Sequence, residues 1–197
     1  MVFAYYNRLS ASRRRTYRKS DTLRSLPLPP NVSPAEVLAR LALALKHDRR
    51  METQSACQEL IDQLARGYAV PPIRVSVLAA RPSNDYGELH GYYEPLEENK
   101  LAHISVWMRT AQRKQVVAFK TFLRTLIHEL CHHLDYELFL LPETFHTEGF
   151  YKRESSLANA LLEQMTPPEA VGKAAENMSA RAEALELARR LSRTTRP

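Results

Sequence analysis

The stretch LIHELCHHLDYE, residues 126–137, contains two histidines and a glutamate in an HExxH pattern. It belongs to a longer segment, residues 110–139, in which apolar residues recur at helical spacing. This periodicity predicts one long amphipathic helix. On a wheel of about 100° per residue, its apolar residues fall within about 60° of Leu130 and predict a core-facing stripe. The stripe consists of Phe119, Leu123, Leu126, Ile127, Leu130 and Leu134.

The two histidines of the pattern lie on the opposite side of this helix. His128 and His132 fall at roughly 160° and 200° on the same wheel. Histidines at i and i+4 share a face and can bind one metal ion, and Glu129 beside the first of them is suited to act as general base. A helix with merely solvated histidines is the competing interpretation. His133 and Cys131 lie off the metal face, so we interpret both as structural residues.

A catalytic zinc ion normally has three protein ligands, so a third ligand is expected downstream. His146 is the first candidate because it follows His132 by fourteen residues, enough for the chain to turn back over the ion. Glu148 and Glu154 are alternatives that spacing does not exclude. Asp135 lies one turn after His132, where it is either an acceptor for a ligand imidazole N–H or a solvated acid.

The remaining pattern predicts an α+β protein with helices packed on a small sheet and the metal helix lying across it. Strands are expected at residues 73–80 and 101–108, which are rich in β-branched residues or alternate in polarity. Helices are expected from Ser33, which forms a capping pattern with Pro34 and Glu36, and from about residue 149. These expected elements divide the chain into three parts. They are a basic, flexible arm at 1–33, a metal-binding domain at 34–165 with two N-terminal helices, and a charged C-terminal helix at 166–197.

Two further groups of residues are candidates for contact with a substrate. His103 and Trp107 share one face of the strand at 101–108, where they would either line the path of an extended peptide that adds by β-pairing or simply cover the sheet. A phenol can donate a hydrogen bond to a developing oxyanion. The tyrosines considered for this role are Tyr92, Tyr93, Tyr136 and Tyr151.

The positive charge of the chain is concentrated at its N-terminus. Residues 1–33 contain seven arginines and lysines and a single acid, Asp21, so they account for the whole formal charge of +6. Contact with nucleic acid phosphates would therefore arise from this arm, and a solvated tail is the alternative. The other expected partner is a protein or peptide substrate.

The expected location is the cytoplasm. The apolar runs are shorter than the roughly 20 residues of a membrane span, and the N-terminus lacks the pattern of a secretory signal. Cys57 and Cys131 are too few for a disulfide framework, so both are expected to be free thiols.

The sequence resembles the SprT-like zinc metallopeptidases. That family pairs an HExxH helix with a downstream HxxxF, which match His128, Glu129 and His132, then His146 and Phe150. The resemblance covers residues 73 to about 162 and implies a zincin-like domain, one Zn2+, Glu129 as base and hydrolysis of peptide bonds. Many members also carry a cysteine zinc ribbon, whereas this chain has no cysteine after Cys131.

The hypothesis from the sequence is therefore a cytoplasmic zinc metallopeptidase that acts on DNA-associated or other protein substrates. Its alternative is a non-catalytic, zinc-stabilised protein whose basic arm contacts nucleic acid or a protein partner. A fourth position left open to water would favour the enzyme, and a fourth protein ligand would favour the scaffold.

Overall fold

The computed structural model describes residues 3–84, 87–98 and 100–165. The helix expected at 166–197 lies outside the described residues. In chain order the elements are η1 (Ala4–Arg8), α1 (Ala11–Thr22), α2 (Ala35–Lys46), α3 (Arg50–Tyr68), β1 (Ile73–Ala80), β2 (Ser83–Asn84), β3 (Gly87–Glu88), β4 (Gly91–Glu94), β5 (Ala102–Arg109), α4 (Phe119–Glu137) and α5 (Glu148–Glu163).

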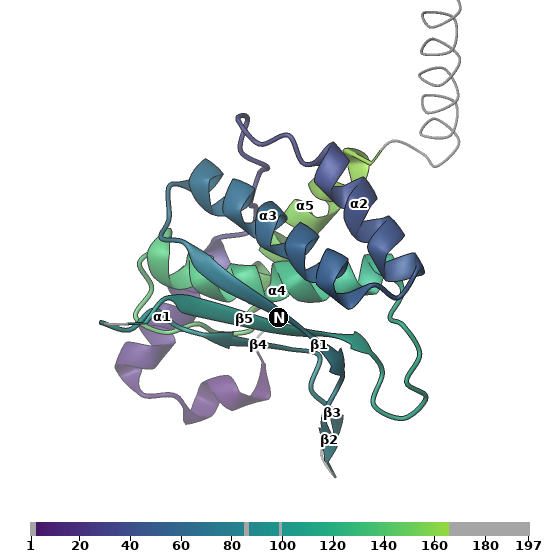
Figure 1. Cartoon of the computed structure of the whole chain (residues 1–197). Coiled ribbons are helices and arrows are strands. Elements are labelled where there is room, and N and C mark those ends of the chain that lie inside the picture. Colours follow the sequence, from purple (N-terminus) through teal and green to yellow (C-terminus); the bar gives the residue numbers. More distant parts are fainter. Residues whose placement is uncertain (1–2, 85–86, 99, 166–197) are drawn as a thin grey trace, which may run out of the picture. The chain divides into compact units, whose positions relative to one another are not determined.

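A three-stranded sheet with the order β1-β5-β4 forms the base of the fold (Figure 1). β5 runs parallel to β1 and antiparallel to β4. Because side chains alternate along a strand, one face carries the apolar residues Val75, Val77, Ile104 and Val106, all of which are buried. This arrangement confirms the predicted α+β class, with a small mixed sheet.

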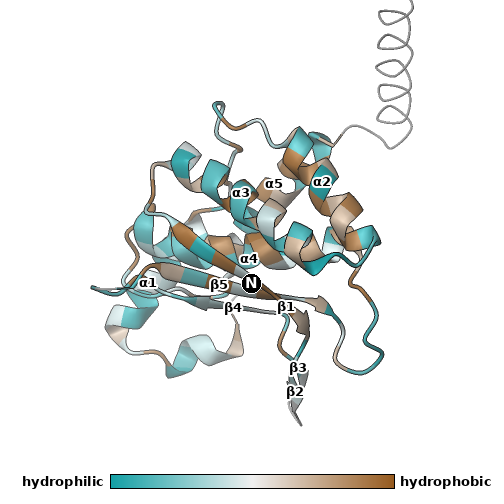
Figure 2. Cartoon of the chain, viewed as in Figure 1, coloured by the Kyte–Doolittle hydropathy of each residue, from teal (hydrophilic) through white to brown (hydrophobic). Residues whose placement is uncertain are grey.

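Helices cover the apolar face of the sheet. α3 packs on β1, while α4 packs on β4 and β5 (Figure 1). α2 lies against α3, and α5 lies against α4. Hydrophobic residues are prominent along β1 and β5 and on α2, whereas α1 is largely hydrophilic (Figure 2). The apolar residues predicted for the two N-terminal helices are buried: Val37, Leu38, Leu41, Leu45, Cys57, Leu60, Ile61 and Leu64.

The metal helix α4 is shorter than its apolar periodicity suggested. It begins at Phe119, whereas the sequence predicted a start near Thr110. The intervening residues turn back onto β5, with the amide of Val117 donating to the carbonyl of Met108 at 2.7 Å. Val117 is buried by this pairing. Val116 fits the helical repeat by its spacing, but in this returning segment it forms a β-bridge with Arg109, which explains the error.

The N-terminal segment, residues 3–26, is folded onto the domain, so the prediction of a flexible arm is wrong. α1 is capped by Ser10, whose side chain accepts from the amide of Arg13, and it packs against α5. Tyr17 is only 1% exposed and forms a small core with Leu9 and Phe145. Few apolar residues suffice here because the aromatic rings of this segment pack against one another and against the loop before α5.

The basic side chains of the N-terminal segment contact the domain. Arg13 binds Glu143 through two nitrogen–oxygen contacts, one of them 2.7 Å long. Lys19 donates to the carbonyl of Phe139 at 3.2 Å, and Arg18 donates to the hydroxyl of Tyr6 at 2.7 Å. The charge density that suggested a solvated or nucleic-acid-binding tail therefore lies largely on a folded helix, and three of its cations, Arg13, Arg18 and Lys19, form hydrogen bonds within the protein.

Side chains from α3 occupy the outer edge of β1. Gln58 accepts from the amide of Val75 and donates to the carbonyl of Ile73, each at 2.8 Å. Gln54 accepts from the amide of Val77 at 3.1 Å. These contacts satisfy the backbone groups of an edge strand that could otherwise pair with another chain.

At the opposite side of the sheet, β4 has no further strand beyond it among the described elements. None of the helices that the structure describes is both long enough and apolar enough to cross a bilayer.

Candidate metal centre

Three imidazole rings converge at one point beside α4. The Nε2 atom of His146 lies 3.0 Å from Nε2 of His128 and 3.1 Å from Nε2 of His132. Nitrogens bound tetrahedrally to one metal ion at about 2.0–2.1 Å would lie about 3.3 Å apart, close to these separations. The three histidines form the group that could hold a metal ion among the described residues.

His146 reaches this point because α5 begins directly after it. Thr147 caps α5 by accepting from the amide of Phe150 at 2.9 Å, so the residue before the cap is placed over α4. Phe150 is fully buried and its ring contacts all three imidazoles, with centroid separations of 5.0, 4.8 and 5.1 Å to His128, His132 and His146. The second residue of the HxxxF pattern is thus the apolar floor of the site.

Hydrogen bonds at the far side of two rings determine which nitrogen faces the centre. Nδ1 of His128 lies 2.9 Å from the Glu154 carboxylate, which can only accept when it is ionised. Nδ1 of His132 lies 2.8 Å from the hydroxyl of Thr144, and that hydroxyl donates to Asp135 at 2.9 Å. Both Nδ1 atoms must therefore carry hydrogen, which leaves the Nε2 lone pairs of His128 and His132 directed at the centre.

Two facing lone pairs are an arrangement that could hold a cation. A single N–H on His146 can satisfy only one of the two neighbouring nitrogens well, whereas a metal ion would bind all three. Burial lowers the pKa of His132 to about 3, with further lowering by the neighbouring histidines. Burial likewise lowers the pKa of His146. Both rings are therefore neutral near pH 7, the form that binds metals.

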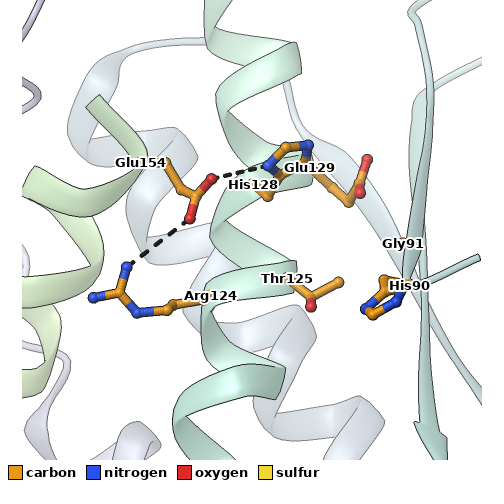
Figure 3. Close-up of a pocket in the computed structure, with 7 residues that line it drawn as sticks. All are labelled: His90, Gly91, Arg124, Thr125, His128, Glu129 and Glu154. Atoms are coloured by element: carbon orange, nitrogen blue, oxygen red, sulfur yellow. Dashed lines mark hydrogen bonds and ion pairs between the residues drawn. The ribbon is translucent and has the colours of Figure 1, made fainter. Parts of the chain in front are cut away.

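Glu129 points into the opening beside the histidines and is close to β4. Figure 3 shows its side chain extending from α4 toward Gly91, while Glu154 approaches His128 from α5. Glu129 is 6% exposed, and burial raises the pKa of its carboxyl group to about 7. Two pockets are each lined in part by Glu129, His128 and Gly91.

Gly91 leaves the space that Glu129 occupies. A methyl group at Gly91 would lie 2.8 Å from both Cγ and Cδ of Glu129. Since Gly91 pairs with Val106, it faces the helices, as does Tyr93 two residues later. The absence of a side chain at this position is therefore what allows α4 to place its carboxylate against the edge strand.

The four candidate tyrosines occupy different positions. Tyr93 faces α4, but its hydroxyl is 3.0 Å from Nδ1 of His133, and burial raises its pKa. Tyr92 points to the opposite face of the sheet and is 53% exposed. Tyr136 lines the pocket that contains His132 and His146. The ring of Tyr151 stacks on that of His146 at a centroid distance of 5.9 Å. Tyr93 also stacks on His132 at a centroid distance of 6.2 Å, so Tyr93, Tyr136 and Tyr151 all lie near the histidines, and the Tyr93 hydroxyl is already hydrogen-bonded to His133.

His103 and Trp107 do not line the metal centre. Their side chains point to the sheet face opposite α4, where His103 contacts Glu94 at 2.9 Å and Ser76 at 2.8 Å. Both hydrogen-bonding edges of β5 are occupied, by β1 and by β4. Of the two alternatives for His103 and Trp107, the structure therefore favours residues that cover the sheet, because sequence alternation does not reveal which strand is at the edge.

The burial of the cysteines, His133 and Asp135 tests the remaining predictions for residues on or near α4. Cys57 and Cys131 are free and buried, as predicted, and burial raises the pKa of the Cys131 thiol. His133 is buried and contacts the carbonyl of Pro71 at 3.2 Å, in line with a structural role. Asp135 is fully buried rather than solvated, and it reaches His132 only through Thr144.

Neither acidic alternative to the third ligand belongs to the cluster. Glu154 holds the outer nitrogen of His128, and Glu148 forms an ion pair with Lys152 at 2.7 Å.

Sequence reasoning missed Gly91, Thr144 and Arg153 as parts of the site. Gly91 begins a short strand beside a tyrosine pair, and only the packing of α4 shows why a side chain is excluded there. Thr144 lies in a loop without periodicity. An arginine among the apolar positions of α5 is the one available signal, since a buried arginine requires an acidic partner.

Comparisons with known proteins identified no relative of this chain. No protein-family model matches the chain, and searches of curated proteins and of solved structures found no significant match.

Proposed function

We propose that the protein is a zinc-dependent peptidase of the SprT-like type, which hydrolyses peptide bonds in protein substrates. The observation that carries this proposal is the convergence of three imidazole nitrogens beside a buried glutamate. A structural site would need no base at this place. The charge and burial of Glu129 instead suit a group that exchanges a proton with a bound molecule.

Zinc is the metal that best suits these ligands. Three imidazoles with an open fourth position are a donor set typical of catalytic zinc. Among the described residues no fourth His, Cys, Asp or Glu joins the cluster. When bound, zinc would polarise a carbonyl oxygen and lower the pKa of a coordinated water toward about 7.

Residues around the metal ion would then have two kinds of role, proton transfer and orientation of the ligands. Glu129 would accept a proton from the attacking water and return it to the leaving amine. Glu154 and Thr144 would hold the rings of His128 and His132 in the orientation that ligation requires.

A polypeptide substrate fits the surroundings better than a small molecule does. β4 is the edge strand beside Glu129, and its backbone could pair with an extended segment of substrate. One pocket next to Glu129 contains Arg124 and Thr125, and the other contains Tyr92, Tyr93 and Tyr136. These two pockets offer space for side chains on either side of the bond that is cut.

Metal-dependent cleavage of an unfolded protein tests this proposal. Reduced, denatured casein incubated with the zinc-loaded protein is expected to be cleaved, because an extended chain can reach β4. A chelator should abolish cleavage, and stoichiometric Zn2+ should restore it where Mg2+ does not. If the loaded protein binds one zinc per chain and leaves a diverse set of unfolded substrates intact, the zinc-stabilised scaffold becomes the better hypothesis.

Gly91→Ala is expected to lower hydrolysis by about 10–100-fold with little change in stability or zinc content. The added methyl group would lie 2.8 Å from Cδ and Cγ of Glu129, so that side chain would have to leave its position beside the histidines. Rates on a fluorogenic peptide, together with thermal melting, would measure this. Glu94→Ala, on the other face of the same strand, serves as control. Equal losses in both variants would mean that β4, rather than Glu129, was disturbed.

A further inference from the structure

A buried arginine joins the N-terminal segment to the helix that carries the metal ligands. Arg153 on α5 is 1% exposed and forms an ion pair with the fully buried Asp135 on α4 at 2.6 Å. The same guanidinium donates to the carbonyls of Ser20 at 2.7 Å and Leu23 at 2.5 Å. These carbonyls lie at the C-terminal end of α1, where backbone acceptors lack helical partners and a cation is favourable.

The network continues from Asp135 to the metal centre. One carboxylate oxygen of Asp135 accepts from Arg153, and the other accepts from Thr144 at 2.9 Å. Thr144 in turn accepts from Nδ1 of His132 at 2.8 Å. A continuous chain of three hydrogen bonds therefore connects Arg153 to a ligand imidazole.

The N-terminal segment also contacts the loop that carries the third ligand. Tyr5 donates to the backbone carbonyl of His146 at 3.3 Å. The hydroxyl of Ser20 lies 3.3 Å from that of Thr147, and Asp21 accepts from the amide of Gly149 at 2.9 Å. Backbone oxygens of Ser20 and Asp21 leave no space for a side chain at Gly149. The start of α5 is thus fitted closely to the end of α1.

We propose that Arg153 is a positioning residue that couples docking of the N-terminal segment to the metal affinity of the three histidines. The coupling rests on the metal site of the proposed function and is independent of whether that site hydrolyses peptides. Docking of α1 would fix Arg153, which fixes Asp135 and Thr144 and thereby the ring of His132. Because coupling between two sites is reciprocal, metal binding should tighten the docking of α1 to the same degree.

Measurements of zinc affinity test whether docking of α1, acting through Arg153, strengthens metal binding. Arg153→Lys keeps the charge but loses the fork that reaches Ser20, Leu23 and Asp135 together, so zinc affinity is expected to fall by about 10–100-fold. Thr144→Val should weaken zinc to a similar degree, because valine cannot accept from His132, whereas Thr144→Ser should restore binding. Competition with a chelating dye gives the dissociation constants. The d–d absorption of bound Co2+ reports ligand geometry, which a simple loss of stability would not change.

Two controls separate positioning from general destabilisation. Arg40→Met breaks an exposed ion pair with Glu59 on α2 and α3 and should leave the zinc dissociation constant unchanged. Leu38→Ala creates a cavity in α2 and should lower the melting temperature without changing the Co2+ spectrum. If Thr144→Val and Thr144→Ser bind zinc equally, the route through Asp135 is refuted, even where Arg153→Lys is weakened.

Amide hydrogen exchange tests the reciprocal effect, that bound metal tightens the docking of α1. Adding Zn2+ to the full chain is expected to slow exchange in α1 about 10–100-fold more than in α2, the same factor as the change in affinity. In Arg153→Lys this selective protection of α1 should disappear. Equal protection of α1 and α2 by zinc in the parent protein would overturn the coupling, and failure to hydrolyse any peptide would leave it standing.

Discussion

Glu129→Gln is expected to reduce peptide hydrolysis by about 10²–10⁴-fold while zinc remains bound at one ion per chain. Glutamine has nearly the same shape as glutamate and fits the space beside Gly91, but its amide cannot accept a proton from water. The carboxyl group of Glu129 is buried, with its pKa raised to about 7, so its removal also relieves desolvation of a charge. The folded state of the variant should therefore be at least as stable as that of the parent.

Steady-state rates on a fluorogenic peptide, with zinc measured by atomic absorption on the same sample, would give both quantities. Glu154→Gln provides a comparison on the same pocket: it lies against His128 and is expected to weaken zinc as well as activity. A Glu129→Gln protein that cuts as fast as the parent would exclude Glu129 as the base. Loss of zinc in that variant would show instead that Glu129 supports the metal.

His146→Ala is expected to weaken zinc binding by on the order of 10²–10³-fold and to abolish hydrolysis at micromolar zinc. Zinc in protein sites with four ligands binds with about 10–16 kcal/mol of apparent free energy, which is roughly 2.5–4 kcal/mol per ligand. His146 lies in the loop before α5 and outside the hydrophobic core, so the core should tolerate alanine there. Its removal would leave the lone pairs of His128 and His132 without the third nitrogen.

Chelator competition on the purified variant measures this effect, and His47→Ala at the end of α2 is the matched histidine control. Zinc held as tightly as in the parent would contradict the assignment. It would direct attention to Glu154, whose carboxylate already lies against His128, or to Glu148 at the start of α5.

The metal helix shows how far local spacing can predict a site. The separation of His128 and His132 by four residues places both on one face of any α-helix, and His146 was expected from the need for a third ligand. The predicted positions of all three histidines are confirmed, since Nε2 of His146 lies 3.0 Å from Nε2 of His128 and 3.1 Å from Nε2 of His132. The strand at 73–80 was predicted with its observed bounds, and the strand at 101–108 was displaced by one residue.

The N-terminal segment shows where the same reasoning failed. Its composition of arginines suggested a solvated arm, yet Tyr17 is buried, and Arg13 and Lys19 contact the domain. The partners of these residues lie more than 100 positions away in several cases, at Glu143 and Phe139. No local pattern contains that information.

Residue type and spacing along the chain were enough to identify the α+β class, the metal helix and the three histidines, because helical geometry converts spacing into direction. Three features came only from packing. Gly91 makes room for Glu129, Thr144 and Asp135 hold His132, and Arg153 ties α1 to that network. Each of these is a contact between elements distant in sequence, and such contacts exist only after the sheet and helices have assembled around one core.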